Sequence, residues 1–468
     1  MVLNGAVTDT LDPAAATGDL PIRRPNDNPY LAGNLAPVTD EVTAFDLPTN
    51  GQIPAELEGR WLRNGPNPEA MADPSKHHWF LGNGMVHGVR LRGGNAEWYR
   101  NRFVLGAAER AGGMSGPNTN VGGFAGTTWA MVEAGSPPVE LGYELDSKGP
   151  NRFNGTLEGP FTAHPKYDPT TGELHSMNYH WPDLVDHVNY TVVGGDGRVT
   201  KNLAIPVNDM PMMHDMSLTE KYAVIYDLSV TVNFDVLAAG FAFPFKWDAD
   251  RPCRVGLLPR DGTDDDVIWC DVDPCYVFHP LNAFDAADGT VVVDVCRYDA
   301  IMVDDRLGPF GDNLATFDRW VIDPTTKRVT ETRLDDRPQE FPRHNPNFGL
   351  RQHRFGYTSE VTTGDTYNRN IHGAIIKIDT DTGSTETHEF GHGRGGAEPV
   401  FVPKADGVSE DAGWILTVVY DATTDQSELH ILDAEDISGP EVASIALPQR
   451  VPFGFHGNWV PDTSVAPD

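Results

Sequence analysis

The sequence predicts an all-β protein, and among all-β architectures it favours a β-propeller over a large sandwich or barrel array. Short apolar runs separated by Gly, Pro, Asn and Asp fill most of the chain, whereas helical periodicity is scarce. One kind of turn, rich in Asp, Gly and Thr, recurs between strand-like runs. A single propeller also absorbs all 468 residues as one unit, although length alone would suggest about three domains.

The chain divides into a leader and one predicted domain. Residues 1–27 are small, polar and Pro-containing, and we expect a mobile N-terminal leader ahead of a single propeller catalytic domain over residues 28–468. The leader lacks the basic start and continuous apolar core of a signal peptide. No apolar run reaches transmembrane length, and the four cysteines form no paired CxxC units. These features predict a cytoplasmic protein with reduced thiols.

Hairpin turns are the repeating unit of the predicted strands. Gly93-Gly94-Asn95 separates the strand-like runs 89–91 and 96–104. Similar turns are expected at Asp168–Gly172, Gly194–Gly197, Asp323–Lys327 and Asp379–Gly383. An Asp side chain opens such a turn, and Gly supplies the positive φ that closes it. The repeats are too divergent for the blades to be counted from the sequence.

The charge of the chain excludes one class of partner. Lys and Arg number 35 against 68 Asp and Glu, a formal net charge of −33. A field of this sign repels phosphate backbones, so we expect no nucleic-acid binding. It also opposes electrostatic docking on an anionic membrane. The acidity says little about a neutral substrate.

The segment Phe234–Trp247, FDVLAAGFAFPFKW, is rich in Phe and carries little charge. Two interpretations remain open for it. In the first, it is an exposed apolar surface at an entrance, which admits a hydrophobic substrate and makes weak contact with a membrane. In the second, it is a buried helix or crossover.

Four of the sixteen histidines stand in similar settings, each after apolar or small residues: His164, His214, His279 and His456. Their spacings fit no helical or hairpin motif, so they converge only if the fold brings distant strands to one axis, as a propeller does. A cluster of imidazoles would bind a metal, and zinc, copper, iron and nickel all suit it. His87 also follows apolar residues, but we assign it a structural hydrogen bond.

Three glutamates in apolar settings are candidates to support such a site: Glu133, Glu340 and Glu398. A histidine that binds a metal usually donates its other N–H to a carboxylate, a backbone carbonyl or water. The alternative for each is an ordinary surface carboxylate.

These residues lie within a series of motifs: Leu62–Pro68, Gly82–Gly88, Trp98–Arg102, Asn118–Asn120, Val132–Gly135, Thr162–Lys166, Met213–Asp215, Phe278–Pro280, Glu340–Arg343, Glu398–Pro403 and Phe455–Gly457. In sequence and order they resemble the carotenoid cleavage oxygenase family, which also includes bacterial stilbene-cleaving dioxygenases. The resemblance covers the chain from about residue 28 to its end.

The resemblance implies a seven-bladed β-propeller in which loops and short helices form a cap over an axial Fe(II). His164, His214, His279 and His456 match the family's iron ligands, and Glu133, Glu340 and Glu398 match the carboxylates that orient them. Thr119 matches a small side chain that crowds one open iron position. The implied reaction is cleavage of a C=C bond of a hydrophobic conjugated substrate by O2, which gives two carbonyl products and needs no general base.

The substrate is predicted from two further positions. Stilbene-cleaving relatives hold a phenol with a tyrosine, matched here by Tyr99, and with a lysine, where this chain has Val132. An apolar side chain in place of the cation suits a polyene, so we expect a carotenoid or apocarotenoid. The alternatives are a stilbene or phenylpropanoid substrate, or a propeller that binds a lipid without catalysis. Nothing in the sequence predicts the oligomeric state.

Overall fold

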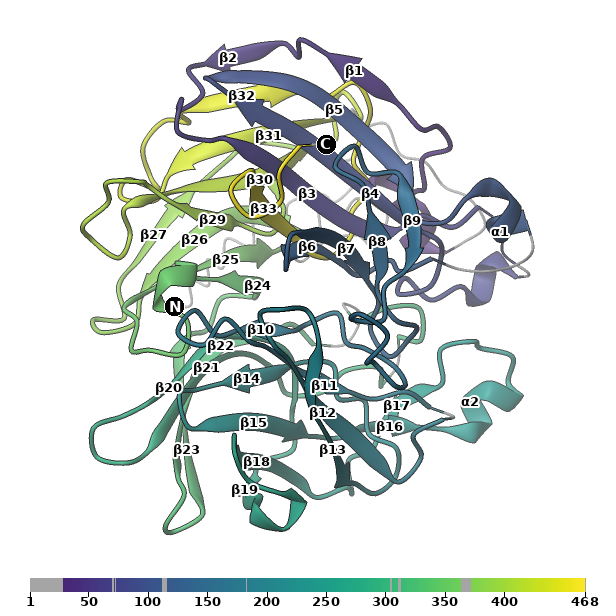
Figure 1. The fold of residues 1–468 in the computed structure, drawn as a ribbon, viewed down its shortest axis with the longest axis vertical. Coiled ribbons are helices and arrows are strands. Elements are labelled where there is room, and N and C mark those ends of the chain that lie inside the picture. Colours follow the sequence, from purple (N-terminus) through teal and green to yellow (C-terminus); the bar gives the residue numbers. More distant parts are fainter. Residues whose placement is uncertain are drawn as a thin grey trace, which may run out of the picture.

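The structure is a computed structural model that describes residues 28–467, except 70, 72, 112–115, 182, 304, 310–312 and 363–371. The predicted leader at 1–27 lies outside the described residues. Seven sheets of four or more strands form a seven-bladed β-propeller (Figure 1), which confirms the predicted fold class.

Five of the seven sheets are antiparallel meanders of four strands each, taken in chain order. They are β6 to β9 (Asn120–Phe124, Thr127–Met131, Val139–Leu141, Ser147–Pro150), β10 to β13 (Lys166–Tyr167, Leu174–Asn178, His187–Val193, Val199–Pro206), β14, β15, β18 and β19 (Met216–Leu218, Tyr222–Asp227, Cys253–Pro259, Ile268–Val272), β20 to β23 (Tyr276–Asp285, Val291–Tyr298, Thr316–Asp323, Arg328–Asp335), and β24 to β27 (Gln339–Arg343, Phe355–Val361, His372–Asp379, Thr385–His388).

The other two sheets join the two ends of the described chain. One has the order β1-β5-β4-β3-β33 (Thr43–Phe45, Asn95–Phe103, Gly84–Arg92, Gly59–Pro66, Gly457–Pro461). The other has the order β2-β32-β31-β30-β28, with β29 also paired to β30 (Thr49–Gly51, Ala443–Ala446, Gln426–Asp433, Gly413–Asp421, Arg394–Gly396, Val400–Pro403). Each sheet combines strands from both ends, so together they close the ring.

The closure brings two backbones into direct contact. Gly454, two residues before His456, lies against β3: a Cβ at Gly454 would stand 2.8 Å from Cα of Gly65 and 2.9 Å from the carbonyl oxygen of Asn64. Only glycine fits there, because neither backbone atom can move aside alone.

The predicted turns connect the strands as expected. Gly93 and Gly94, at φ 54° and 77°, link β4 to β5. The carboxylates of Asp168, Asp323 and Asp379 each accept a hydrogen bond from the backbone N–H two residues on, at 2.8 to 3.0 Å. These turns lie between β10 and β11, β22 and β23, and β26 and β27.

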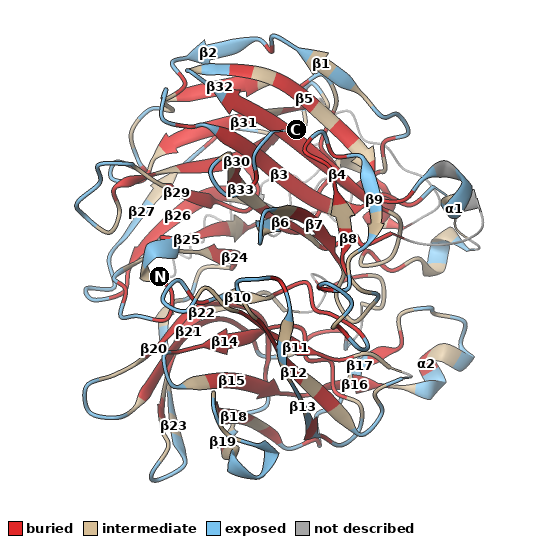
Figure 2. Cartoon of the chain, in the orientation of Figure 1, coloured by how far each residue is buried: buried red, intermediate tan, exposed pale blue. Residues whose placement is uncertain are grey.

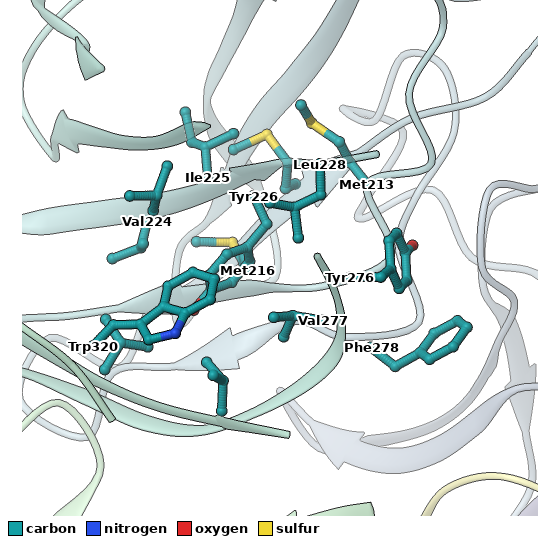
Figure 3. Close-up of a cluster of buried hydrophobic side chains, with 14 of the residues drawn as sticks. Met213, Met216, Val224, Ile225, Tyr226, Leu228, Tyr276, Val277, Phe278 and Trp320 are labelled. Carbon is teal, nitrogen blue, oxygen red and sulfur yellow. The ribbon is translucent and has the colours of Figure 1, made fainter. Parts of the chain in front are cut away.

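Buried side chains hold the inner strands in place (Figure 2). In the largest core cluster, Met213 and Met216 flank His214, and Phe278 immediately precedes His279. Figure 3 shows Met213, Met216 and Phe278 in one cluster with Trp320. The chain around His214 and His279, at β14 and β20, is therefore anchored in the core.

Helices are short and lie outside the sheets: α1 and α2 (Ala107–Ala111, Phe234–Ala238) and the 3-10 turns η1 to η5 (Pro29–Leu31, Gly33–Leu35, Pro74–Lys76, Asp264–Asp266, Pro346–Phe348). In the described part of the chain, none has the length and apolar character needed to span a bilayer.

The segment 234–247 combines both sequence interpretations. It contains α2 and continues into β17 (Phe245–Trp247), which pairs with β16 (Val230–Val232) beside the main sheets (Figure 1). Phe234 is 61% exposed, whereas Phe245 is only 4% exposed. The helix α2 is thus largely exposed, whereas Pro244 and Phe245 farther along the segment are buried.

Substituting Gly454→Ala tests the closure. We expect a loss of about 1–3 kcal/mol in unfolding free energy, because the added methyl overlaps the backbone of β3. Urea unfolding measures it. Gly106→Ala is the control, since its Cβ meets only the movable Glu109 side chain, at 3.3 Å. Equal stability of both variants would show that the contact at Gly454 is not tight.

Candidate metal centre

Four blades bring the predicted histidines together on the axis. His164 and His214 lie just before β10 and β14, His279 lies within β20, and His456 immediately precedes β33. All four are buried, and one ring nitrogen from each lies within 4.8 Å of the others. The sequence separations of these residues do not indicate that they converge, because the convergence results from the ring of blades.

The other three blades supply the glutamates. Glu340 lies in β24, Glu398 lies between β28 and β29, and Glu133 follows β7. Each faces the Nδ1 atom of one histidine: His214 to Glu133 at 2.7 Å, His279 to Glu340 at 2.6 Å, and His456 to Glu398 at 2.9 Å. Each of the seven blades therefore contributes one of these seven side chains.

Local distortions of the strands aim these side chains. The pairing of β20 with β21 shifts register on both sides of Pro280, next to His279. The pairing of β24 with β25 shifts between Glu340 and Arg343. Phe341, which follows Glu340, and Ala134, which follows Glu133, both have positive φ, at 56° and 49°. Bulges re-aim side chains, and left-handed non-glycine residues persist where the surrounding packing fixes them.

The glutamates are themselves held. The Tyr179 hydroxyl donates to Oε1 of Glu133, and the backbone N–H of Phe341 donates to Oε2 of Glu340 at 2.6 Å. Glu398 accepts from the backbone N–H of Gly457 at 2.7 Å and from Arg343 at 3.2 Å. Each carboxylate is thus restrained by at least one donor besides its histidine.

These contacts keep two of the carboxylates charged although they are buried. Burial alone would raise the pKa of Glu398, but Arg343 and His456 hold it at about 2. Burial likewise opposes the charged form of Glu133, yet His214 and Tyr179 keep its pKa below the ordinary value.

The donor set fits a bound cation. A histidine that donates Nδ1–H to a carboxylate presents the lone pair of Nε2 on its other side. The Nε2 atoms of His214 and His279 face each other at 3.2 Å, and Nε2 of His164 is buried without a hydrogen-bond partner among the described residues. Two lone pairs at that distance need a positive charge between them, either a proton or a metal cation. An all-imidazole set suits iron and other transition metals.

Two of the axial histidines have lowered pKa values, whereas Glu340 overcomes the effect of burial and raises the pKa of His279. Burial, followed by the neighbouring imidazoles, lowers the pKa of His164 well below its ordinary value. Burial also lowers the pKa of His456, to about 4, although Glu398 opposes the shift. Both side chains are therefore neutral at pH 7, as metal binding requires.

An apolar cavity of about 560 Å³ reaches the axial histidines. Its wall is largely aromatic and includes Trp79, Phe80, Phe243, Phe278, Phe341 and Phe455. Val132 and Thr119, both named from the sequence, also line it. Ligand cavities are mostly apolar with a few placed polar groups, and this cavity has that character.

A second cavity, of about 450 Å³, follows the axis and is lined by residues of all seven inner strands. Its wall carries Lys166, Asp215 and Arg343. His279 and His456 line both cavities, so the histidine cluster lies between the apolar cavity and this second, more polar cavity.

The structure does not bring Tyr99 to the site. Tyr99 lies in β5, is fully buried, and packs in the core cluster that contains Trp61 and Leu416. Its hydroxyl lies 2.8 Å from Nδ1 of His87, the structural hydrogen bond expected for that histidine. Tyr99 lines neither cavity, because its position in β5 turns the side chain into the core.

Thr119 is at the site through its backbone as well as its side chain. Its carbonyl accepts from the N–H of His456 at 3.0 Å, and its hydroxyl oxygen accepts from the N–H of Glu133 at 3.3 Å. Its role beside an open coordination position stays a prediction.

Sequence reasoning missed several residues. Tyr179, Lys166, Asp215 and Arg343 all contact the site, but no role was assigned to them. Three of these lie in motifs quoted for the resemblance, within three residues of a histidine or glutamate, and that proximity was the available signal. Tyr179 lies in no motif.

Comparison with known proteins gives a consistent result. The sequence model of one family, described as retinal pigment epithelial membrane protein, matches residues 35–461. A carotenoid cleavage oxygenase of Mycobacterium tuberculosis is 42% identical, with 93% of this chain and 98% of that protein aligned. Carotenoid 9,10(9′,10′)-cleavage dioxygenase 1 of Phaseolus vulgaris is 30% identical, with 92% and 89% aligned.

Solved structures agree. Lignostilbene dioxygenase of Pseudomonas brassicacearum superposes with a TM-score of 0.83 at 26% identity, covering 93% of this chain and 99% of that one. A cobalt-substituted apocarotenoid oxygenase of Synechocystis gives a TM-score of 0.81 at 26% identity, covering 91% and 97%.

Replacing Glu398→Gln tests the buried charge. The variant leaves Arg343 and His456 without a charged partner, so we expect a loss of about 2 kcal/mol in unfolding free energy at pH 7. Because the folded pKa is depressed, this stabilisation is present above about pH 4.5 and is lost as the pH falls toward about 2.

Urea unfolding of both proteins between pH 7 and pH 3 measures the effect. The difference in unfolding free energy between wild type and variant should shrink below about pH 4.5. Glu386→Gln, at an exposed position in β27, is the control and should show little difference at any pH. A difference for Glu398→Gln that does not change with pH would contradict the assignment.

Proposed function

Because the chain belongs to the retinal pigment epithelial membrane protein and carotenoid cleavage oxygenase family, and is an oxidoreductase of its dioxygenase type, we propose that it cleaves one C=C bond of a carotenoid or apocarotenoid with O2. Fe(II) is the proposed cofactor, held by His164, His214, His279 and His456. The reaction converts one C=C bond and one O2 molecule into two carbonyl groups, so its atoms balance without a further reductant.

The chain's own part is to hold the metal and to place the substrate. When bound, the iron supplies the activation of O2 that the organic substrate cannot provide. The three glutamates keep the Nε2 atoms directed at the axis. No titratable side chain is needed to move a proton, because C=C cleavage to two carbonyls transfers none.

The aromatic cavity carries the substrate proposal. Its apolar wall ends at the histidines, so an extended polyene within it would lie with one double bond beside the metal. The same wall keeps water from the reacting bond, and rigid aromatic faces such as those of Phe80 and Phe278 restrict how the chain can lie.

A phenolic substrate is the second candidate, because the fold matches that of a lignostilbene dioxygenase. Two features of this chain oppose it. Val132 provides no cation at the cavity wall, and Tyr99 lies in the core with its hydroxyl bound to His87. The hydroxyl of Tyr179 already donates a hydrogen bond to Glu133, so it does not donate to a phenol. We therefore favour a polyene.

Product analysis tests this proposal. Iron-loaded protein is offered an apocarotenal, a full-length carotenoid and a 4-hydroxystilbene under ¹⁸O2. We expect carbonyl products from a carotenoid or apocarotenoid, with label in both fragments and the stilbene unchanged. Label in only one fragment would contradict the dioxygenase reaction, and aromatic aldehydes from the stilbene alone would contradict the substrate.

Val132→Lys refines that experiment. An ammonium group without a partner in the apolar wall should lower polyene cleavage at least about tenfold, whereas Val132→Met, which is larger but apolar, should stay within about threefold. Similar losses in both variants would show that size, not charge, matters at this position.

The exposed half of segment 234–247 supports a weak contact with membranes. Phe234 projects into solvent on α2, and Ala242 to Phe245 farther along the segment line the substrate cavity. An apolar surface that leads to an apolar cavity is suited to take a lipophilic substrate from a bilayer. The net negative charge favours neutral over anionic lipid.

Cosedimentation with phosphatidylcholine vesicles tests the contact. Phe234→Glu should reduce the bound fraction severalfold, since a charge replaces the apolar group that enters the interface. Val408→Glu is the matched control: Val408 is 99% exposed and lines no part of the substrate cavity. Equal binding of both variants and wild type would rule out α2 as the contact.

A further inference from the structure

The four axial histidines are not supported in the same way. Three of them have a glutamate oxygen within 2.9 Å of Nδ1. His164 has none: the carboxylate that faces it belongs to Asp215, whose Oδ2 lies 3.9 Å from Nδ1. That separation is too long for a direct hydrogen bond and suits one bridging water or a small side-chain rotation.

Asp215 is a fixed, buried carboxylate. Its side chain is 3% exposed, and Nζ of Lys166 lies 2.8 Å from Oδ1 and 2.9 Å from Oδ2. The backbone N–H of Met216 also donates to Oδ1. A paired ammonium and a backbone donor fix the orientation of this buried carboxylate.

The sequence positions of this pair place it at the metal centre. Lys166 follows His164 by two residues, and Asp215 directly follows His214. The ion pair therefore joins the inner strands of two neighbouring blades, β10 and β14, beside two of the metal ligands. His164, Lys166 and Asp215 all line the polar cavity, so the gap between Nδ1 and Oδ2 opens on a space that can admit water.

We propose that Asp215, held by Lys166, is the positioning carboxylate of His164. It directs Nδ1–H away from the axis and thereby turns Nε2 toward the metal, as the glutamates do for the other three ligands. Because the carboxylate is farther away and shares its charge with Lys166, His164 is the weakest donor of the four. This inference rests on the metal site of the proposed function, but not on the substrate or the reaction.

Asp215→Asn tests the proposal, because it keeps the size of the side chain and removes its charge. The matched control is Asp411→Asn. Nζ of the buried Lys377 lies 2.8 Å from Oδ2 of the half-buried Asp411, in a pair that also joins neighbouring blades but lines neither cavity.

The readouts are the affinity for Co(II), measured by chelator competition without substrate or O2, and the visible spectrum of the bound Co(II). Asp215→Asn should weaken binding about 10- to 100-fold and alter the spectrum, and Asp411→Asn should change neither. In a His164→Ala background, Asp215→Asn should cause no further loss, since its target is gone. Where Asp215→Asn does not fold, Asp215→Ser, which keeps a hydroxyl near Met216, replaces it with the same expectation.

Binding by Asp215→Asn within about twofold of wild type would overturn the proposal. So would an equal loss in the presence and absence of His164, which would show that Asp215 acts elsewhere. Wild-type protein that binds no Co(II) or Fe(II) would overturn both this inference and the proposed function. Wild-type protein that binds metal, responds to Asp215→Asn and cleaves no carotenoid would overturn only the proposed function.

Discussion

A hydrogen bond from the Nδ1–H of a histidine to a buried carboxylate is the interaction on which this structure depends. An imidazole has two nitrogens, and only the one without a proton can bind a metal. Glu133, Glu340 and Glu398 each face an Nδ1 atom and leave Nε2 for the axis. Without these carboxylates, three of the four buried imidazoles would have no fixed tautomer and no common direction.

The propeller architecture allows this arrangement of side chains with only local changes in the strands. Seven inner strands meet around one axis, and each needs to contribute only one side chain to the centre. The register shifts at β20 and β24 and the left-handed residues Ala134 and Phe341 then aim individual side chains. Closure by β33 completes the site, because His456 enters with the last strand. The stability of the ring and the geometry of the centre are thus coupled.

Much of the fold followed from local chemistry that the sequence displays. Turns opened by Asp168, Asp323 and Asp379 were predictable because an Asp side chain caps its own turn. The histidines were recognisable by their apolar settings, but their convergence was not, since the number of blades and the closure decide which distant strands meet. The resemblance to family motifs indicated that these histidines converge, which their spacing alone could not indicate.

Other features had no local signal, for physical reasons. Tyr99 lies in β5, which β4 and β3 separate from the inner strand β33, and both faces of β5 pack into core clusters. The cavity wall comes largely from connecting segments such as 79–82 and 242–245, which carry no periodic pattern. The composition of segment 234–247 is apolar along its length, so it did not distinguish the exposed Phe234 in α2 from the buried Phe245 in β17. The difference arises because β17 pairs with β16.

The most direct test of this account is the iron content of the purified protein after anaerobic loading with Fe(II), measured beside four single variants in which each axial histidine is replaced by Ala. The account predicts one iron per chain for wild type and loss of bound iron in every variant, smallest for His164→Ala. Wild-type protein without stoichiometric iron, or full iron retention when His279 is removed, would contradict it.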